Sequence, residues 1–363
     1  MLTSQIQMVI DTYFPKNNFK TTQSNLAKIV WLNGSSSSLS YLTITGSYIA
    51  DAPILLPSQF ILVMNQATIT AAPALFSSAQ NTALLQARGN AIINMKGSNF
   101  AGVVSPSGPS GATIDCSAYP AGSNAPNSFG YPAVPSPAGT SSATGPDGIV
   151  AVGSNNIYID GINVRRCGLT SANFAFFNTK VVEMTNCIST AGGVRGIWVI
   201  ITSNSAISFN LIETSFKFGI DFDASSGPWT MVHSNTFKNN VFQAVFIEQG
   251  TEYSVVSNNV LGPNNQNGVS FFNNIYPELV TDHVILNNYM FASTGAGINV
   301  GSVSCVQISA SCPVVVGFWP SVNSYIMGNS IWGNRKSGIA SNGAASGFYY
   351  SHNNDTQVRK YTD

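Results

Sequence analysis

The sequence predicts an all-β fold, a parallel solenoid with coils of about 24 residues. Three observations lead to this prediction. A short apolar or β-branched run ending in Asn recurs along the second half of the chain, and a small residue follows most of these Asn residues nine positions later. The composition, with 32 Gly and only 8% charged residues, suits short strands joined by tight turns.

The Asn repeat sets the length of one coil. The intervals between successive Asn residues are 23, 24, 25, 24, 29, 41 and 24 residues. This period is too short for a strand–helix–strand unit. In a solenoid, Asn at a fixed turn position can hydrogen-bond the Asn of the next coil, and it tolerates a left-handed backbone. The repeat consists of Asn163, Asn186, Asn210, Asn235, Asn259, Asn288, Asn329 and Asn353.

The small residues predict where a second strand of each coil begins. After Asn186 the offset is ten residues, to Gly196, and elsewhere it is nine. Two patterns kept in step through six coils favour one continuous architecture. The remaining members of this column are Gly219, Ala244, Gly268, Gly297 and Gly338.

The N-terminal part is expected to close one end of the solenoid. Apolar residues at Ile6, Val9 and Ile10 follow helical spacing after Thr3 and Ser4, which can cap a helix. We therefore predict one domain over residues 1–363, with an amphipathic capping helix. Its parts are a cap over 1–30, first coils over 31–150 with a Pro/Gly/Ser-rich loop at 104–147 that walls a cleft, and regular coils over 151–356.

Composition also limits partners and location. The net charge is zero, with 15 basic and 15 acidic residues, which argues against nucleic acid. No apolar run is long enough to span a membrane. The N-terminus lacks a signal peptide as it stands, so we expect a secreted protein without its leader, with a cytoplasmic location as the alternative. Cys305 and Cys312 are either a small disulfide loop or free buried thiols, and no spacing indicates zinc.

Two acids interrupt an apolar strand in the stretch "GIDFDASSGPW", which begins at Gly219. Side chains alternate along a strand, so Ile220 and Phe222 are expected to point inward, and Asp221 and Asp223 outward. The inward positions of the neighbouring strands are apolar as well, namely Ile197, Val199, Val245, Ile247, Val269, Phe271, Ile298 and Val300.

Aligning the next coil adds a third acid to this outer face. Glu248 falls in the column of Asp223, about 4.8 Å away at the backbone. Carboxylates this close suit a general acid that faces an ionised base or nucleophile. The predicted catalytic residues are therefore Asp221, Asp223 and Glu248.

Other outward positions are candidates for substrate binding. Outward aromatic residues can stack on sugar rings, and cations before the strands can bind a sugar acid or orient a carboxylate. Polar residues continue the same columns on later coils. The predicted set is Trp198, Phe246 and Phe272, with Arg195, Lys217, Ser270 and Asn299.

The Asn ladder and the coil length resemble those of the pectate-lyase-like superfamily of right-handed parallel β-helices. This resemblance covers about residues 150 to 355 and implies the fold and a carbohydrate substrate. The superfamily contains glycoside hydrolases, transferases, lyases, epimerases and tailspikes. The Gly-His-Gly and Arg-Ile-Lys segments of the similar polygalacturonases are absent.

Three functions remain open. The first is hydrolysis or transfer of glycosidic bonds in a poly- or oligosaccharide by the carboxylate pair, without a cofactor. The second is a lyase or epimerase for uronic acids in which Asp221, Asp223 and Glu248 bind Ca²⁺. The third is a glycan-binding or structural solenoid. We favour the first, because a lyase also needs a basic residue, and only Arg195 and Lys217, just before the strands, could serve.

Overall fold

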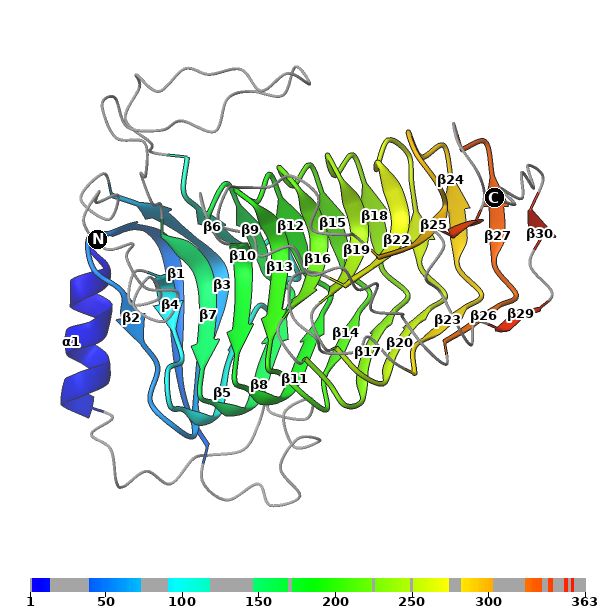
Figure 1. The fold of residues 1–363 in the computed structure, drawn as a ribbon. Helices are drawn as coiled ribbons and strands as arrows, with labels where there is room; N and C mark the ends of the chain where they lie inside the picture. Colours follow the sequence, from blue (N-terminus) through cyan, green and yellow to red (C-terminus); the bar gives the residue numbers. More distant parts are fainter. Residues whose placement is uncertain are drawn as a thin grey trace, which may run out of the picture. The chain divides into compact units, whose positions relative to one another are not determined.

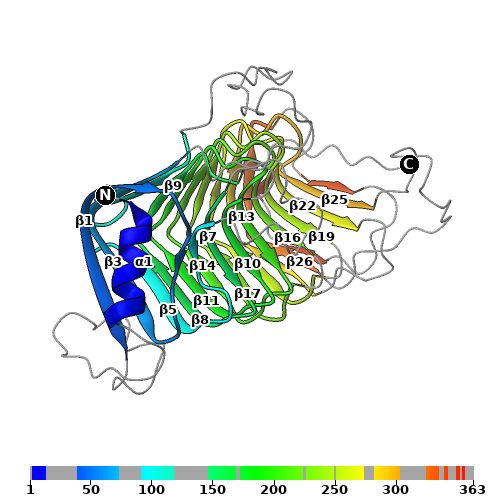
Figure 2. The same ribbon diagram turned by 90° about the vertical axis from the view of Figure 1, so that its left-hand side faces the viewer.

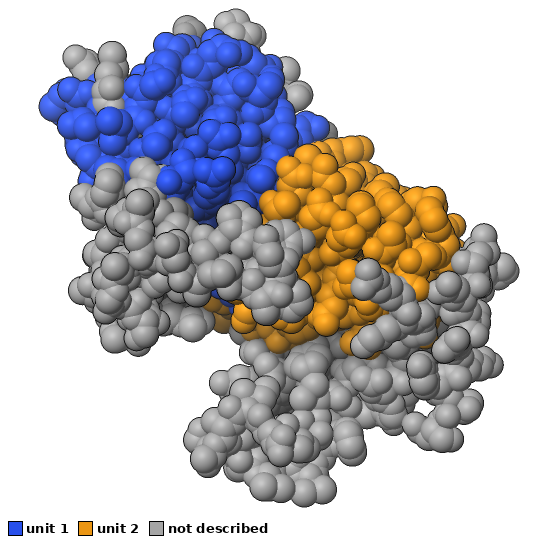
Figure 3. Space-filling view, turned by 90° about the horizontal axis from the view of Figure 1, so that it is seen from above, with its two compact units in different colours: residues 1–197 blue, residues 198–363 orange. Residues whose placement is uncertain are grey.

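The computed structural model consists of two compact units, residues 1–197 and 198–363, and the boundary falls inside strand β13 (Arg195–Ile200) (Figure 3). Each unit consists almost entirely of parallel strands. Whether the chain forms the single domain predicted from sequence stays a prediction. The structure describes residues 2–13, 39–72, 91–117, 146–168, 172–223, 226–248, 251–273, 282–302, 324–334, 339–341, 349–351 and 354–355.

The described part of unit 1 contains one helix and two sets of parallel strands. In one set β2, β4, β7 and β10 pair in this order. In the other, the long β1 pairs with β3, β3 pairs with both β5 and β6, and these pair with β8 and β9. The elements are α1 (Thr3–Tyr13), β1 (Ser40–Ala50), β2 (Ile54–Leu55), β3 (Phe60–Ala71), β4 (Ala91–Asn94), β5 (Asn99–Val104), β6 (Ala112–Asp115), β7 (Asp147–Val152), β8 (Asn155–Asp160), β9 (Asn163–Arg165), β10 (Ala172–Phe177), β11 (Lys180–Thr185) and β12 (Ile188–Thr190).

Helix α1 confirms the predicted cap. Ile6 and Ile10 are buried, and the helix lies against β1 and β2, the first strands of unit 1 (Figure 2). The N-terminal end of the helix is bound by a residue 47 positions later in the chain. The N–H and Oγ of Ser4 both donate to the carboxylate of Asp51. This bond satisfies one of the free N–H groups that every helix leaves at its start. The helix is too short to cross a membrane, and no other described helix has the length and apolar character for it.

Unit 2 repeats one coil pattern. Strands β16, β19, β22, β25 and β28 lie side by side in one sheet (Figure 1). The strands are β14 (Ala206–Ser208), β15 (Leu211–Glu213), β16 (Phe218–Asp223), β17 (Thr230–His233), β18 (Thr236–Lys238), β19 (Gln243–Glu248), β20 (Ser254–Ser257), β21 (Val260–Leu261), β22 (Asn267–Asn273), β23 (Val284–Leu286), β24 (Tyr289–Phe291), β25 (Ile298–Ser302), β26 (Tyr325–Met327), β27 (Ser330–Trp332), β28 (Ile339–Ser341), β29 (Tyr349–Ser351) and β30 (Asn354–Asp355).

The inward positions of these strands form the core, as predicted. Ile220 pairs with Val245 and Val245 with Val269, and all three side chains are fully buried. Each fully buried side chain of this kind contributes roughly 1.5–3 kcal/mol. The predicted small residues of β16, β19 and β22 lie at the second position of these strands. A Cβ on Gly219 would lie 2.5 Å from the backbone oxygen of Ala244 and 2.8 Å from Cδ1 of Phe237, so the coil closes tightly here because the residue is Gly.

The predicted Asn ladder is present in unit 2. It joins five coils through bonds from Nδ2 of each Asn to Oδ1 of the next, at 2.9, 3.1, 2.9 and 3.1 Å. Each Oδ1 also accepts the backbone N–H of the Asn before it. Because these amides are buried, each bond prevents an unsatisfied polar group that would cost about 1–3 kcal/mol. The ladder consists of Asn210, Asn235, Asn259, Asn288 and Asn329.

In unit 1 the predicted ladder positions Asn163 and Asn186 are wrong by one residue. Cys187 immediately precedes β12, as Asn210 precedes β15, and it is Cys187 that is buried. Asn186 occupies the preceding turn position with φ of 51°. Asn163 begins β9 and pairs with Ile188. Asn suits both the ladder and the left-handed turn position, so the sequence motif alone could not separate them.

A second, shorter ladder was not predicted. Asn240 donates from Nδ2 to Oδ1 of Asn265 at 3.1 Å, and Oδ1 of Asn240 accepts the N–H of Ser215. In a later coil, Oδ1 of Asn334 accepts the N–H of Ser293. The two ladders fix consecutive turns of each coil and so hold the strands of unit 2 in register.

The structure contains a disulfide between Cys116 and Cys167, which the sequence analysis did not identify. The thiol of Cys187 is buried, and burial raises its pKa to about 12. Cys305 and Cys312 lie outside the described residues, as do residues 118–145 of the predicted loop, Asn353 and Gly338.

Candidate active site

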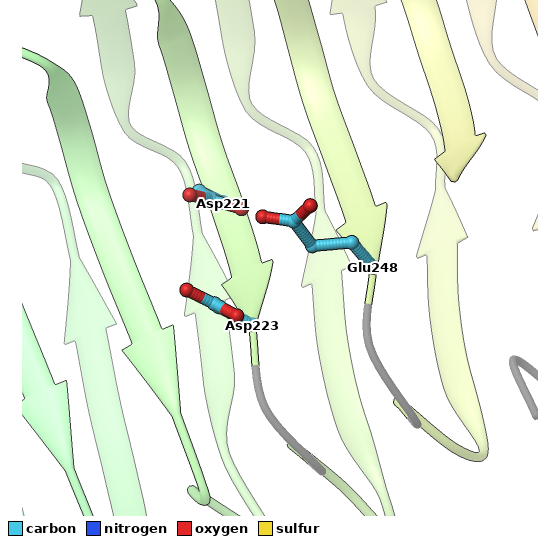
Figure 4. A group of neighbouring side chains, drawn as sticks. All are labelled: Asp221, Asp223 and Glu248. Atoms are coloured by element: carbon cyan, nitrogen blue, oxygen red, sulfur yellow. The ribbon is translucent and has the colours of Figure 1, made fainter. Parts of the chain in front are cut away.

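Two neighbouring strands of unit 2 bring the three predicted carboxylates together. Asp221 and Asp223 lie on β16, and Glu248 ends β19. The two strands pair with Asp221 opposite Phe246 and Phe222 opposite Ile247. This register sets Glu248 beside Asp223, and Figure 4 shows its side chain extending toward β16.

The carboxylates form a tight and enclosed cluster. One oxygen from each lies within 4.8 Å of the others, and the exposed fractions of Asp221, Asp223 and Glu248 are 0%, 9% and 6%. Two unit charges at this separation repel by roughly 4 kcal/mol at an effective dielectric constant of about 20. Three ionised carboxylates here are therefore unfavourable unless they share a proton or a cation. Among the described residues, this is the one group of acidic, His or Cys side chains that could hold a metal ion.

Trp198 contacts this cluster directly. Its Nε1–H donates to Oδ2 of Asp223 at 3.3 Å. A hydrogen bond of this kind is stronger when its acceptor is ionised than when both groups are neutral. Only 6% of Trp198 is exposed, so its ring offers little surface for the sugar stacking that the sequence suggested. Its observed role is to orient a carboxylate.

An aromatic pair forms the apolar side of the site. Phe246, which stands opposite Asp221, stacks on Phe218 with ring centroids 4.5 Å apart and an interplanar angle of 11°. Only 6% of Phe246 is exposed, so Phe218 covers the ring that was expected to face a substrate. Phe218 was missed because it lies at the start of β16, where strict alternation does not yet apply.

The positions of Asp221 and Phe246 are occupied by polar residues on the next two coils. Ser270 pairs with Phe246 on one side and with Asn299 on the other. Ser270 is fully buried, and its Oγ makes no hydrogen bond within the described structure, whereas Asn299 is half-buried. Phe272 pairs with Glu248, and its side chain lies outside the described part. These positions agree with the predicted register.

The two predicted cations lie at the beginnings of their strands. Lys217 is exposed and precedes β16, four residues before Asp221, which is about 13 Å along an extended chain. Arg195 begins β13, belongs to unit 1 and is half-buried. Their part in substrate binding stays a prediction.

Hydroxyl groups fix the backbone just after both acidic strands. Ser226 donates from Oγ to the carbonyls of Asp223 and Val199, at 2.7 and 2.9 Å. In the equivalent place on the next coil, Thr251 donates from Oγ1 to the carbonyl of Glu248 at 2.6 Å. Both bonds constrain the strand ends that carry the carboxylates.

His283 supports the second of these turns from the following coil. Its Nδ1 accepts the N–H of Ser254 at 3.2 Å, so Nε2 carries the proton and donates to the carbonyl of Thr251 at 2.9 Å. Burial lowers the pKa of His283 to about 4, although the Thr251 carbonyl and Asp282 act in the opposite direction. His283 is therefore a neutral structural residue near neutral pH, and no sequence motif marked it.

The family described as right handed beta helix region matches residues 139–261. Together with the parallel pairing of successive coils, this match decides the architecture. The fold is a right-handed parallel β-helix. No curated protein sequence matches the chain.

Solved structures share this β-helix at low sequence identity. A polygalacturonase from Erwinia carotovora has a TM-score of 0.58 and 14% identity over 95% of each chain. The A-module of the mannuronan C-5 epimerase AlgE4 from Azotobacter vinelandii has a TM-score of 0.53 and 14% identity, over 93% of this chain and 94% of that one. PfbA, a surface adhesin of Streptococcus pneumoniae, has a TM-score of 0.50 and 12% identity, over 96% and 95%. At these identities the likeness shows the fold alone.

Proposed function

We propose that the protein is a carbohydrate-active enzyme that cleaves or transfers glycosidic bonds of a poly- or oligosaccharide. The observation that carries this proposal is the convergence of Asp221, Asp223 and Glu248, whose oxygens lie within 4.8 Å of one another on two paired strands. The similar structures include a polygalacturonase, which supports a carbohydrate substrate. Since polysaccharides are met mainly outside the cell, secretion is part of the proposal.

The roles follow from exposure and hydrogen bonding. Asp223 and Glu248 keep 9% and 6% of their surface exposed and Asp221 keeps none, so the first two are the members of this buried cluster assigned to the reacting atoms. Asp223, with the Trp198 N–H on its carboxylate, acts as the nucleophile at the anomeric carbon. Glu248 gives its proton to the leaving oxygen. Asp221 lies beside both, and because three ionised carboxylates this close repel one another, the cluster favours a shared proton, which we assign to Glu248 as the acid.

The second half of the reaction restores both groups. Water attacks the glycosyl ester on Asp223 and gives its proton to Glu248, which releases the sugar and the Asp223 carboxylate. In a transfer reaction a sugar hydroxyl replaces the water. Retaining enzymes hold their two carboxyl groups about 5–5.5 Å apart, and inverting enzymes about 6.5–9.5 Å. The 4.8 Å cluster fits the retaining route better.

The same cluster favours a second candidate, an elimination or epimerisation of uronic acids that depends on a divalent cation. Three carboxylates offer the oxygen ligands that Ca²⁺ prefers. In this reaction the cation would neutralise the cluster and the sugar carboxylate. A similar structure is a mannuronan C-5 epimerase, which agrees with this candidate.

The deciding experiment is a screen of polysaccharides with product masses, in the presence of EDTA and of Ca²⁺. Hydrolysis adds the mass of water, whereas elimination gives an unsaturated product that absorbs in the ultraviolet. We expect hydrolysis or transfer that is insensitive to EDTA and is lost in Asp223→Asn and in Glu248→Gln. Full activity in both variants would disprove the site, and activity that needs Ca²⁺ would favour the second candidate.

A further inference from the structure

Two aromatic side chains lie exposed on the turns that follow the acidic strands. Trp229 is 64% exposed and Tyr253 is 41% exposed. Their rings stack with centroids 5.7 Å apart and an interplanar angle of 24°. Since Thr230 pairs with Ser254, Trp229 and Tyr253 occupy the same position on successive coils.

This position has a left-handed backbone on four coils. The φ values are 53° at Asn204, 67° at Trp229, 49° at Tyr253 and 59° at Asp282. Asn and Asp are the residues that adopt this conformation most readily after Gly, whereas bulky side chains are uncommon in it. The flanking coils thus carry the residues that the backbone favours. The two coils that carry the carboxylates carry Trp and Tyr instead, which points to a use for these rings.

The turns hold the two rings in place before any ligand arrives. The N–H of Trp229 donates to the carbonyl of Tyr253 at 3.1 Å, and the N–H of Asn204 donates to the carbonyl of Pro228 at 2.9 Å. The N–H of Glu252 donates to the carbonyl of Ser226 at 3.0 Å. A ring fixed by such a ladder loses little entropy when it binds, which favours affinity.

The pair is also near the carboxylates along the chain. Trp229 comes six positions after Asp223 in the chain, so their backbones are at most about 22 Å apart. Tyr253 comes five positions after Glu248, a span of at most about 18 Å. A polysaccharide bound at the carboxylates extends over several sugar units, so one chain can reach both places.

The charges of this region indicate which sugars fit. From Asn239 to Asn334 the sequence contains no Lys or Arg, while it contains Glu248, Glu252, Glu278 and Asp282. Glu252 is exposed and adjoins Tyr253. Two lysines, Lys217 and Lys238, lie before this stretch on the coil of Trp229, and Lys238 is paired with Glu213 at 3.0 Å. Around Tyr253 an anionic polymer would therefore meet carboxylates, whereas a neutral sugar ring can stack on an aromatic face without that repulsion.

We infer that Trp229 and Tyr253 form a binding subsite for neutral sugar rings of a polysaccharide, removed from the bond that reacts. The inference rests on the proposed function for the identity of the ligand class. It adds a second binding site and predicts that the sugars bound there are neutral, which the carboxylate cluster alone does not specify. The two outer ring faces bind sugar, because their column neighbours Asn204 and Asp282 are small.

The test measures binding separately from turnover. The full chain carrying Glu248→Gln is run through native gels that contain a galactan, an arabinan, a xylan, a fructan or polygalacturonate, with EDTA throughout. We expect retardation by at least one neutral polymer and roughly tenfold weaker retardation when Trp229→Ala or Tyr253→Ala is added. Trp229→Phe should restore most of it. Trp332→Ala is the matched control, since Trp332 is 43% exposed and stacks on Phe291.

The outcomes separate this inference from the proposed function. Retention that depends on Trp229, with no turnover of any polymer by the unmodified protein, supports the subsite and overturns the enzyme. Turnover with an unchanged KM in Trp229→Ala overturns the subsite and leaves the enzyme intact. Three further results would also overturn the subsite. They are no retardation by any polymer, an equal loss of retardation in Trp332→Ala, and retardation by polygalacturonate alone. Because Trp229 is exposed, thermal unfolding of each variant checks that folding is unaffected.

Discussion

Each unit of the protein carries acidic residues side by side on adjacent strands, but the two groups differ in how they are stabilised. In unit 1, Asp160 and Glu183 lie on β8 and β11, where Glu183 pairs with Tyr158. Asp160 accepts a hydrogen bond from Nδ2 of Asn186 at 2.9 Å and another from Tyr158. In unit 2, three acids converge on one another to within 4.8 Å.

The difference shows that adjacent acids on a β-helix do not by themselves indicate a reaction. In unit 1 the phenol of Tyr158 and the amide of Asn186 both donate to Asp160, so this acid belongs to an internal polar network. Burial and the charge of Asp160 raise the pKa of Glu183. In unit 2 three acids converge on one another instead, and their mutual repulsion is the feature that suits proton transfer.

The largest expected effect is on activity. Asp223→Asn or Glu248→Gln should lower kcat by roughly 10²–10⁴-fold, because each removes a group that takes part in bond cleavage. Asp160→Asn and Glu183→Gln are the matched controls from unit 1 and should leave kcat within about twofold. Steady-state rates on the polysaccharide found in the screen provide the measurement. A comparable loss from the unit 1 variants would remove the distinction between the groups.

The next effect is on stability in acid, and it arises in unit 2. His283 has a pKa of about 4 when folded and an ordinary value near 6.5 when unfolded, so the unfolded chain binds its proton first. Its contribution is complete above about pH 6.5 and is lost as the pH falls toward 4, by roughly 3 kcal/mol. Glu183 has the opposite sign, because its raised pKa favours folding at low pH.

Urea unfolding at several pH values between 7 and 4 measures this contribution. The variant His283→Gln should lose less stability over this range than the unmodified chain. An equal loss in both proteins would show that other groups cause the acid sensitivity. Glu183→Gln should remove part of the opposing trend.

A smaller effect should appear in stability at neutral pH, with opposite signs in the two groups. Asp221→Asn removes one charge from a repelling cluster, so we expect it to raise the free energy of unfolding by about 1–2 kcal/mol without Ca²⁺. Asp160→Ala leaves Tyr158 and Asn186 without their acceptor and should lower it by about 1–3 kcal/mol. Denaturation in EDTA gives both values. Destabilisation by Asp221→Asn would indicate that this acid is a structural partner, as in unit 1.

The smallest expected effect concerns Trp229. Its left-handed backbone costs a residue with a side chain roughly 1–2 kcal/mol, which Asn tolerates better, while the ring stack with Tyr253 contributes about 0.5–1.5 kcal/mol. Trp229→Asn should therefore change the free energy of unfolding by less than about 1 kcal/mol, although it abolishes sugar stacking. A loss well above this in thermal or urea unfolding would show that Trp229 serves the fold.

The sequence predicted the parts of the protein that depend on alternation and repetition. The buried positions of Ile220 and Val245 follow from the period of a strand, and the placement of Asp223 beside Glu248 follows from the length of a coil. The helix over Thr3–Tyr13 follows from its apolar spacing. These features are local or repeat regularly, so they can be predicted without coordinates.

Features that depend on contacts between particular side chains were not predictable. Trp198 was expected to bind sugar, whereas it is buried and donates to Asp223. The disulfide joins Cys116 to Cys167 across 51 residues, a spacing unrelated to the coil motif. His283 has a structural role only because Thr251 and Ser254 face it from the preceding coil.

The Asn ladder has a consequence for how such a chain can change over evolution. Asn288 and Asn329 are 41 residues apart, yet their amides bond at 3.1 Å as the amides of Asn235 and Asn259 do across 24 residues. The number of residues between two ladder Asn residues can therefore vary, provided the chain returns to the position where the next Asn bonds the previous one. Insertions can accumulate at the turns while the frame keeps its geometry. Substrate range can thus diversify by loop insertion without any change to the strands that hold the carboxylates.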